Sequence, residues 1–173
     1  MTDRAPIETK NLDIYGFEAL PWSRPHDLIA FADPTADLTW FLGTVGPDRR
    51  PHAAGVGAGW HDGDLYFTSG PGTKKSRHLA ENPAASISVR LPGIDLVFEG
   101  EVERVTDRPT LDALVPKFNA GGWPATVEGD AVTAPFSAPS AGPPPWYVYR
   151  FRFDKVVGVA TAEPYGATRW RFA

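Results

Sequence analysis

The chain has 173 residues, no cysteine, 42% hydrophobic and 22% charged residues, and a formal net charge of -4 at pH 7. This length suits one domain with a substantial buried core, and the lack of cysteine excludes disulfides, thiolate chemistry and cysteine-ligated metal centres. The acidic balance gives no reason to expect nucleic acid as a partner. No stretch approaches the roughly 20 apolar residues of a membrane span, and no apolar segment opens the chain, so we expect a cytoplasmic protein without a membrane partner.

Short β-branched and aromatic runs dominate the first two thirds of the chain. Residues 1–25 are polar and interrupted by proline, which predicts an arm that is either disordered or extended over the remainder, residues 26–173, which we expect to form a single domain. Asp62-Gly63 is a strong hairpin signal. The expected strands cover residues 38–45, 52–60, 65–69, 85–91 and 94–105. In the last of these, apolar residues at 94, 96, 98 and 102 alternate with acidic ones, as in a half-buried antiparallel strand.

Two helices are expected between the strands. Thr73 is placed to cap the first, which Asn82-Pro83 ends, and Asp107 is placed to cap the second, which Pro116 should kink or shorten. Residues 119–145 are rich in Gly, Pro and Ala, which predicts an ordered excursion that lines or covers something. WYVYRFRF, KVVGVATA and TRWRF add three short strands. The fold class is therefore mainly β, a six- to seven-stranded antiparallel barrel with inserted helices.

The motifs of several enzyme classes are absent. GVGAG at 55–59 leads into a hairpin and not into a helix, so it is no dinucleotide fingerprint, and GPGTKKS lacks the Gly-Lys-Ser/Thr ending of a phosphate loop. No G-x-S-x-G elbow surrounds Ser69, and the four histidines show no metal-ligand spacing. We therefore assign no metal site and no catalytic residue.

Two features do suggest a ligand. Gly55, Gly57 and Gly59 recur at period two beside Ala53, so one strand face has almost no side chains. Such a face accommodates either close packing within a barrel or a flat ligand. A basic elbow follows, in which Thr73 precedes Lys74, Lys75, Ser76 and Arg77. Positive charge at a helix N-terminus is unfavourable unless an anion is present, so the elbow is either a phosphate site or a solvated basic face.

The segment RPHAAGVGAGWHDGDLYFTSGPGTKKSRHLAENPAASISV, residues 50–89, resembles the pyridoxamine-5'-phosphate-oxidase-like FMN-binding split-barrel family of flavin and deazaflavin oxidoreductases. The resemblance extends over about residues 36–118. It implies a homodimeric split β-barrel with FMN, or alternatively an 8-hydroxy-5-deazaflavin, at the dimer interface. The C-terminal Arg-Leu-x-Pro element of true pyridoxamine phosphate oxidases is absent, since the chain ends in TRWRF, so vitamin B6 oxidation is not expected.

The resemblance also implies which residues bind the cofactor. One group is expected at its phosphate: Thr68, Ser69, Thr73, Lys74, Lys75, Ser76 and Arg77. A second group is expected against its ring system, flanked by Trp60: His52, Ala53, Ala54, Gly55, Val56 and Gly57. At the C-terminus, Trp170 and Arg171 either stack and pair with the cofactor across a dimer or belong to a closing edge strand with buried aromatics and solvated arginines.

The function expected from these features is flavin-mediated hydride or electron transfer to an unknown small molecule. Such chemistry belongs to the cofactor and needs no nucleophilic side chain. The alternatives are a deazaflavin-dependent reductase of the same fold, a non-enzymatic flavin or small-ligand binding protein, and a barrel that has kept the fold and lost the cofactor.

Overall fold

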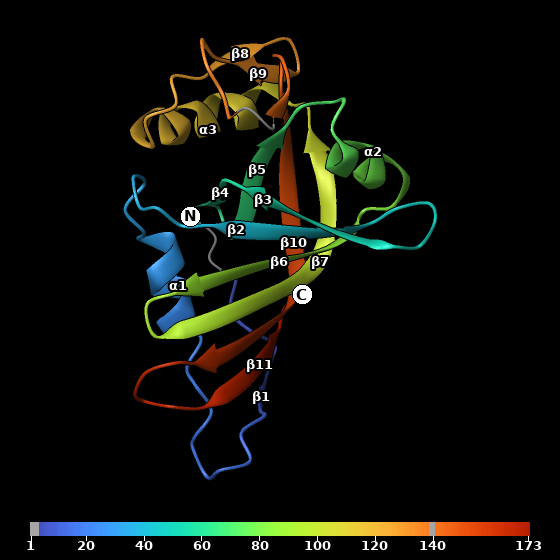
Figure 1. Ribbon diagram of the computed structural model, residues 1–173. Helices are drawn as coiled ribbons and strands as arrows, with labels where there is room; N and C mark the ends of the chain where they lie inside the picture. The colour runs from blue at the N-terminus through green and yellow to red at the C-terminus, as the bar shows by residue number, and fades with distance from the viewer. Residues whose placement is uncertain (1–3, 139–140) are drawn as a thin grey trace.

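A strongly curved antiparallel sheet organises the chain in the computed structural model, which describes residues 4–138 and 141–173 (Figure 1). Its nine strands are β1 (Glu8–Asn11), β2 (Trp40–Val45), β3 (Pro51–Val56), β4 (Ala58–His61), β5 (Asp64–Ser69), β6 (Ala84–Leu91), β7 (Ile94–Val105), β10 (Tyr147–Ala160) and β11 (Ala167–Arg171). Their hydrogen-bonded order is β1-β11-β10-β7-β6-β2-β3, with β5 on β10 and β4 on β5. The short hairpin β8 (Thr126–Glu128) and β9 (Ala131–Thr133) forms a separate sheet.

The long strand β10 joins the parts of the main sheet. It pairs with β7 along one edge, while β5 and β11 share its other edge. The sequence predicted two short strands here, but residues 147–160 form one, because a register shift between Phe153 and Lys155 absorbs the irregular position as a bulge.

The expected count of six or seven strands is too low for the described residues. Strand β1 comes from the expected arm, β8 and β9 come from the excursion, and the predicted strand 52–60 divides at Gly57 into β3 and β4. Strand β1 pairs with β11, so β11 is not an edge strand. Within residues 4–138 and 141–173 the hydrogen-bonded ladder ends at β1, β3 and β4 and does not close into a barrel.

The main core lies against the concave face of this sheet. Strand β7 shows the predicted alternation, with Ile94, Leu96 and Phe98 buried, Asp95 half-buried, and Val97 and Glu99 exposed. Phe151, Phe153 and Trp170 complete this apolar cluster. A second, smaller cluster lies under α3 and is made by Tyr66, Val105, Leu111, Leu114, Val132, Trp146 and Val148.

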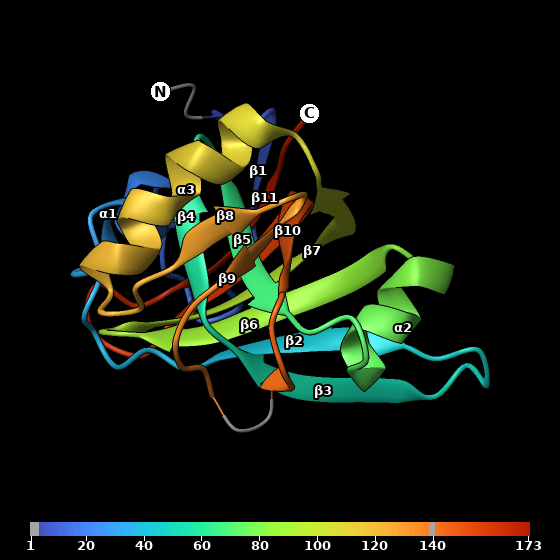
Figure 2. The same cartoon turned by 90° about the horizontal axis from the view of Figure 1, so that it is seen from above.

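Three helices lie at the margins of the sheet (Figures 1 and 2). They are α1 (Ser23–Ala30), α2 (Lys74–Glu81) and α3 (Arg108–Ala120). The Thr73 side chain accepts a hydrogen bond from the Ser76 amide and the Asp107 side chain accepts one from the Thr110 amide, which confirms both predicted caps. Pro116 does not end α3, which continues to Ala120, and α1 was not foreseen. In the part of the chain that the structure describes, no helix combines the length and apolarity needed to cross a membrane.

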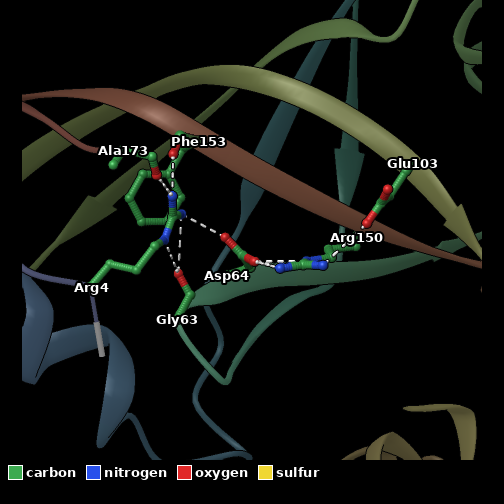
Figure 3. Close-up of polar contacts among 7 residues, drawn as sticks. All are labelled: Arg4, Gly63, Asp64, Glu103, Arg150, Phe153 and Ala173. Atoms are coloured by element: carbon green, nitrogen blue, oxygen red, sulfur yellow. Dashed lines mark hydrogen bonds and ion pairs between the residues drawn. The ribbon is translucent and has the colours of Figure 1, made fainter. Parts of the chain in front are cut away.

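A buried carboxylate ties both ends of the chain to the sheet (Figure 3). The Asp64 side chain is 2% exposed and accepts hydrogen bonds from Arg4 Nη2 at 2.6 Å and Arg150 Nε at 2.7 Å. Arg4 also donates to the carbonyl oxygens of Phe153, at 3.0 Å, and Ala173, at 3.2 Å. Because Asp64 begins β5, this cluster fixes the strand that leads to the elbow.

Candidate functional site

A cavity of about 620 Å³ lies where β3, β4 and β5 meet α3 and the excursion. Figure 2 shows α3 and the β8–β9 hairpin over one side of these strands and α2 beside the other. The lining comes from β3, β4, β5, α2, α3, the excursion outside its β8–β9 hairpin, and the stretch from the end of α1 to the start of β2. It includes Gly55, Gly57, Gly59, Trp60, Tyr66, Thr68, Ser69, Lys75, Leu114, Lys117, Phe118, Trp123 and Trp146. This volume is in the usual range for a cofactor or small-molecule site.

The glycine strip is bare, as the sequence predicted. Gly55, Gly57 and Gly59 are exposed and line the cavity. A Cβ atom built on any of the three meets no other atom within 4 Å. By contrast, a Cβ on Gly158 comes within 2.8 Å of the Trp170 ring, so that glycine serves close packing. No described part of the chain fills the space in front of the strip, so packing within the chain does not explain its three glycines.

The excursion covers the cavity. Trp123 and Trp146 lie with ring centroids 5.3 Å apart, and both line the cavity. Their indole nitrogens donate to carbonyl oxygens of the excursion itself, Trp123 to Phe136 at 2.6 Å and Trp146 to Gly142 at 3.1 Å. They therefore anchor this segment. They also form its apolar inner wall.

The basic elbow contributes one cation to the cavity. Lys75 lines the cavity and is partly buried, and this burial lowers the pKa of its ammonium group. No carboxylate pairs with it among the residues that the structure describes. Lys74 and Arg77 are exposed and lie outside the lining, and Arg77 Nη1 donates to the Gly72 carbonyl at 2.6 Å.

The hydroxyl groups of the elbow bind one another. Ser69 Oγ and Thr73 Oγ1 lie 2.8 Å apart, Ser76 Oγ donates to Ser69 Oγ at 2.9 Å, and Thr73 Oγ1 donates to the Gly70 carbonyl at 2.9 Å. Each hydroxyl has one proton, so these bonds occupy all three donors. The network fastens the end of β5 to the start of α2. A phosphate held by Thr73 or Ser76 would need one of these bonds to break.

Two histidines lie behind the elbow. His78 is buried, and its Nδ1 lies 3.1 Å from Thr44 Oγ1. The His52 ring lies 5.6 Å from the His78 ring. Desolvation, followed by the charges of Lys74, His78 and Lys75, lowers the pKa of His52. His52 is thus close to the basic elbow, although it does not line the cavity.

The remaining predicted residues lie elsewhere. Ala53 and Ala54 belong to β3 but not to the cavity lining. Trp170 is fully buried in the main core, with its ring 5.4 Å from that of Trp22, and Arg171 is exposed near Glu8. This arrangement matches the interpretation with buried aromatics and solvated arginines. A cofactor role for Trp170 and Arg171 stays a prediction that nothing in this arrangement favours.

Sequence reasoning missed two polar residues of the cavity. Tyr66 is buried, and this burial raises the pKa of its hydroxyl. Residues 64–67 of β5 are all buried, so no alternation pattern could reveal which of them face a cavity. Lys117 was also missed, although its spacing from Leu114 and Phe118 places all three on one face of α3.

The arrangement suits a flat, largely apolar ligand with an anionic tail. One wall is the glycine face of β3 and β4, and the opposite wall carries aromatic rings. Lys75 supplies a cation at the end nearest α2. In the described ranges, no cluster of three or more histidine, aspartate or glutamate side chains could hold a metal ion.

Comparisons with known proteins identify a family and similar folds for this chain. The family model described as pyridoxamine 5'-phosphate oxidase matches residues 34–159. No curated protein matches the chain. A solved F420 reductase is 24% identical with a TM-score of 0.51, covering 72% of this chain and 93% of its own. A pyridoxamine 5'-phosphate oxidase-related, FMN binding protein from Nostoc punctiforme is 19% identical with a TM-score of 0.53, covering 90% and 91%. A heme binding protein from Mycobacterium smegmatis is 17% identical with a TM-score of 0.60, covering 87% and 59%.

Proposed function

The chain belongs to the pyridoxamine 5'-phosphate oxidase family, and from this premise we propose that it is an oxidoreductase that binds FMN in the cavity and acts on a small molecule. One observation carries the proposal. The three glycines of the strip leave a face with no atom within 4 Å of an added Cβ, and this face belongs to the same cavity as the partly buried Lys75. A flavin has the matching parts, a flat apolar ring system and a phosphate.

The phosphate is assigned to Lys75. Burial without a carboxylate partner disfavours the charged ammonium, and a phosphate would remove that penalty through a charge-assisted hydrogen bond. The amide groups at the start of α2 favour the same anion. Of the other predicted residues, Thr68 and Ser69 line the cavity beside Lys75, whereas Thr73 and Ser76 support the elbow through their mutual hydrogen bonds.

The ring system is assigned to the glycine strip. Gly55 and Gly57 allow a flat ligand to approach the backbone of β3, and Val56 lines the cavity beside them. When bound, the flavin supplies the hydride or electron chemistry. The chain contributes position, neutralisation of the phosphate charge, and exclusion of water by the rings of Trp60, Trp123 and Trp146.

We extend the proposal to a homodimer. The convex face of the sheet exposes Phe41, Val97 and Val159, with 51%, 42% and 48% of their surface accessible. Strand register places Phe41, Ser88, Val97 and Val157 in one row, and Gly55 pairs with Phe41 at its end. This exposed apolar face is thus continuous with the glycine strip, so a second copy that covers it also reaches the cofactor site.

Alanine variants of two lysines test the phosphate assignment. Loss of a hydrogen bond to a charged group typically costs about 1.5 to 3 kcal/mol, so Lys75→Ala should weaken FMN binding roughly 10- to 150-fold. Lys10→Ala is the matched control, because Lys10 is an exposed lysine of β1 outside the cavity. Equal FMN affinity in wild type and Lys75→Ala would contradict the assignment.

The dimer has its own test. Val97→Glu places a charge in the middle of the exposed apolar face, and light scattering should show a dimer for the wild type and a monomer for the variant. A wild-type protein that is monomeric at micromolar concentration would contradict the dimer, and would leave the cavity assignment to the FMN titration.

A deazaflavin is the second candidate cofactor. An 8-hydroxy-5-deazaflavin also combines a flat ring system with a phosphate-bearing tail, which Lys75 can neutralise. Parallel titrations with FMN and the deazaflavin distinguish the two. Turnover tests with nicotinamide donors then separate an enzyme from a flavin-binding protein. Pyridoxamine 5'-phosphate should not be oxidised, because no Arg-Leu-x-Pro element occurs in residues 1–173.

A further inference from the structure

A second lysine faces the cavity from helix α3. Leu114, Lys117, Phe118 and Gly121 all line the cavity, and their spacing of three and four residues places them on one helix face. A helix that covers an apolar cavity normally presents an apolar face to it. Lys117 is the charged residue of this face; its side chain is exposed and also contributes to the cavity lining.

The charge of Lys117 lacks an anionic partner. Its Nζ donates to the Trp60 carbonyl oxygen at 3.0 Å, which uses one of three donors. No ion pair to Lys117 exists within residues 4–138 and 141–173. The carboxylate of Asp33 also lines the cavity, but its Oδ1 accepts from the Thr35 amide at 2.8 Å and the Thr35 hydroxyl at 2.7 Å. Lys117 therefore has two donors and a full charge available at the cavity wall.

Lys117 and Lys75 serve different ends of the cavity. Lys117 binds the carbonyl of Trp60, which pairs with Leu65 on β5, whereas the Lys75 end is fixed by Ser69 at the other end of β5. Ser69 lies four positions beyond Leu65 along the strand, a length of roughly 13 Å. Figures 1 and 2 both show α3 and α2 on opposite sides of β5. Lys117 and Lys75 therefore approach the cavity from different positions along β5.

We propose that Lys117 binds a carboxylate of the substrate, and that the substrate class is therefore a small apolar molecule bearing a carboxylate. This proposal rests on the cavity being the reaction site. The walls around Lys117 are the rings of Trp60, Phe118 and Trp123, so the body of the substrate is apolar. Lys117 is the residue that selects an anion over a neutral molecule of the same shape.

A purely structural role makes a different prediction. Lys117 lies in the last turn of α3, where a cation is favourable, and it links α3 to the edge strand β4. If this were its whole role, Lys117→Gln would lower thermal stability without changing any preference among ligands. The two roles are therefore separable by measuring ligand preference and stability on the same variants.

The experiment is a calorimetric titration with benzoate and with benzamide, its neutral counterpart of similar shape. Both are titrated into the purified protein, with and without saturating FMN. The variants are Lys117→Gln, Lys117→Arg, Lys75→Ala and, as an exposed control, Lys10→Gln. Benzoate should bind the wild type about tenfold or more tightly than benzamide, since a hydrogen bond between two charged groups is the stronger kind. With saturating FMN, whose phosphate occupies Lys75, Lys117→Gln should abolish this preference, while Lys117→Arg and Lys10→Gln keep it; without FMN, the loss of preference should be larger in Lys117→Gln than in Lys75→Ala.

Every other result overturns the proposal. The proposal is contradicted if benzoate and benzamide bind equally or if neither binds. It is also contradicted if the preference for benzoate survives in Lys117→Gln, or if it is lost in Lys75→Ala instead. Failure of the proposed function is distinguishable, because a protein that binds no FMN still reports its benzoate preference in the titration without cofactor.

Discussion

Substitution of Gly55 tests whether the glycine strip is the ring site. Gly55→Val adds three carbon atoms to a strand position where an added Cβ meets no atom within 4 Å. The free protein should therefore fold normally and gain up to about 0.5 to 1 kcal/mol, because glycine is unfavourable inside a strand. A flavin ring lying on the strip would instead meet an overfilled site, which typically costs about 1 to 3 kcal/mol. FMN binding should weaken roughly 5- to 150-fold.

The assay combines FMN titration, thermal unfolding and light scattering on Gly55→Ala, Gly55→Val and the control Thr9→Val. Thr9 is an exposed residue of β1 outside the cavity, so its variant should behave as wild type. The loss of affinity should grow from alanine to valine while the unfolding temperature does not fall. Unchanged FMN affinity in a well-folded Gly55→Val protein would refute the placement of the ring. A variant that becomes monomeric and keeps its FMN would show instead that the strip contacts the second copy.

Three further substitutions test the supporting structure. Asp64→Ala leaves Arg4 and Arg150 without their carboxylate partner. Since both arginines are partly exposed, we expect the free energy of unfolding to fall by about 2 to 3 kcal/mol, which lowers the unfolding temperature by roughly 5 to 10 °C. A change below 1 °C would contradict this. Thr73→Val removes the helix cap, so the free energy of unfolding should fall by about 1 kcal/mol while the FMN affinity changes little. A loss of FMN affinity as large as that in Lys75→Ala would instead show a direct contact between Thr73 and the phosphate. His52 has its pKa lowered by folding, so its neutral form is favoured and stability falls as the pH drops from about 6.5 through the lowered value. Unfolding temperatures of His52→Gln should fall less over that range, and equal curves for variant and wild type would contradict the assignment.

Much of the sheet could be predicted, because strand and turn signals are local. Asp62-Gly63 forms the expected hairpin turn, with positive φ at both residues, and β6 and β7 lie within a residue of their predicted bounds. The errors arose where pairing is long-range. Strand β1 forms because Glu8–Asn11 pairs with β11. The predicted strand 52–60 breaks at Gly57 because its two halves pair with different strands: β3 pairs with β2, and β4 pairs with β5.

Some residues of the candidate site could likewise be predicted from local patterns, and others could not. Gly55 and Lys75 could be found because period-two glycines and a basic helix start are patterns within short segments. Tyr66 could not, since it lies in a strand buried on both faces. Thr73 and Ser76 were expected to contact the phosphate, but their hydroxyls pair with Ser69, and that choice depends on atomic distances that no pattern encodes.

The most direct test of the central claim is the absorbance spectrum of the purified protein before and after addition of FMN. We expect a shifted flavin spectrum with saturable binding in the wild type and weaker binding in Lys75→Ala and Gly55→Val. A protein that binds neither FMN nor a deazaflavin would contradict the claim that this cavity is a flavin site.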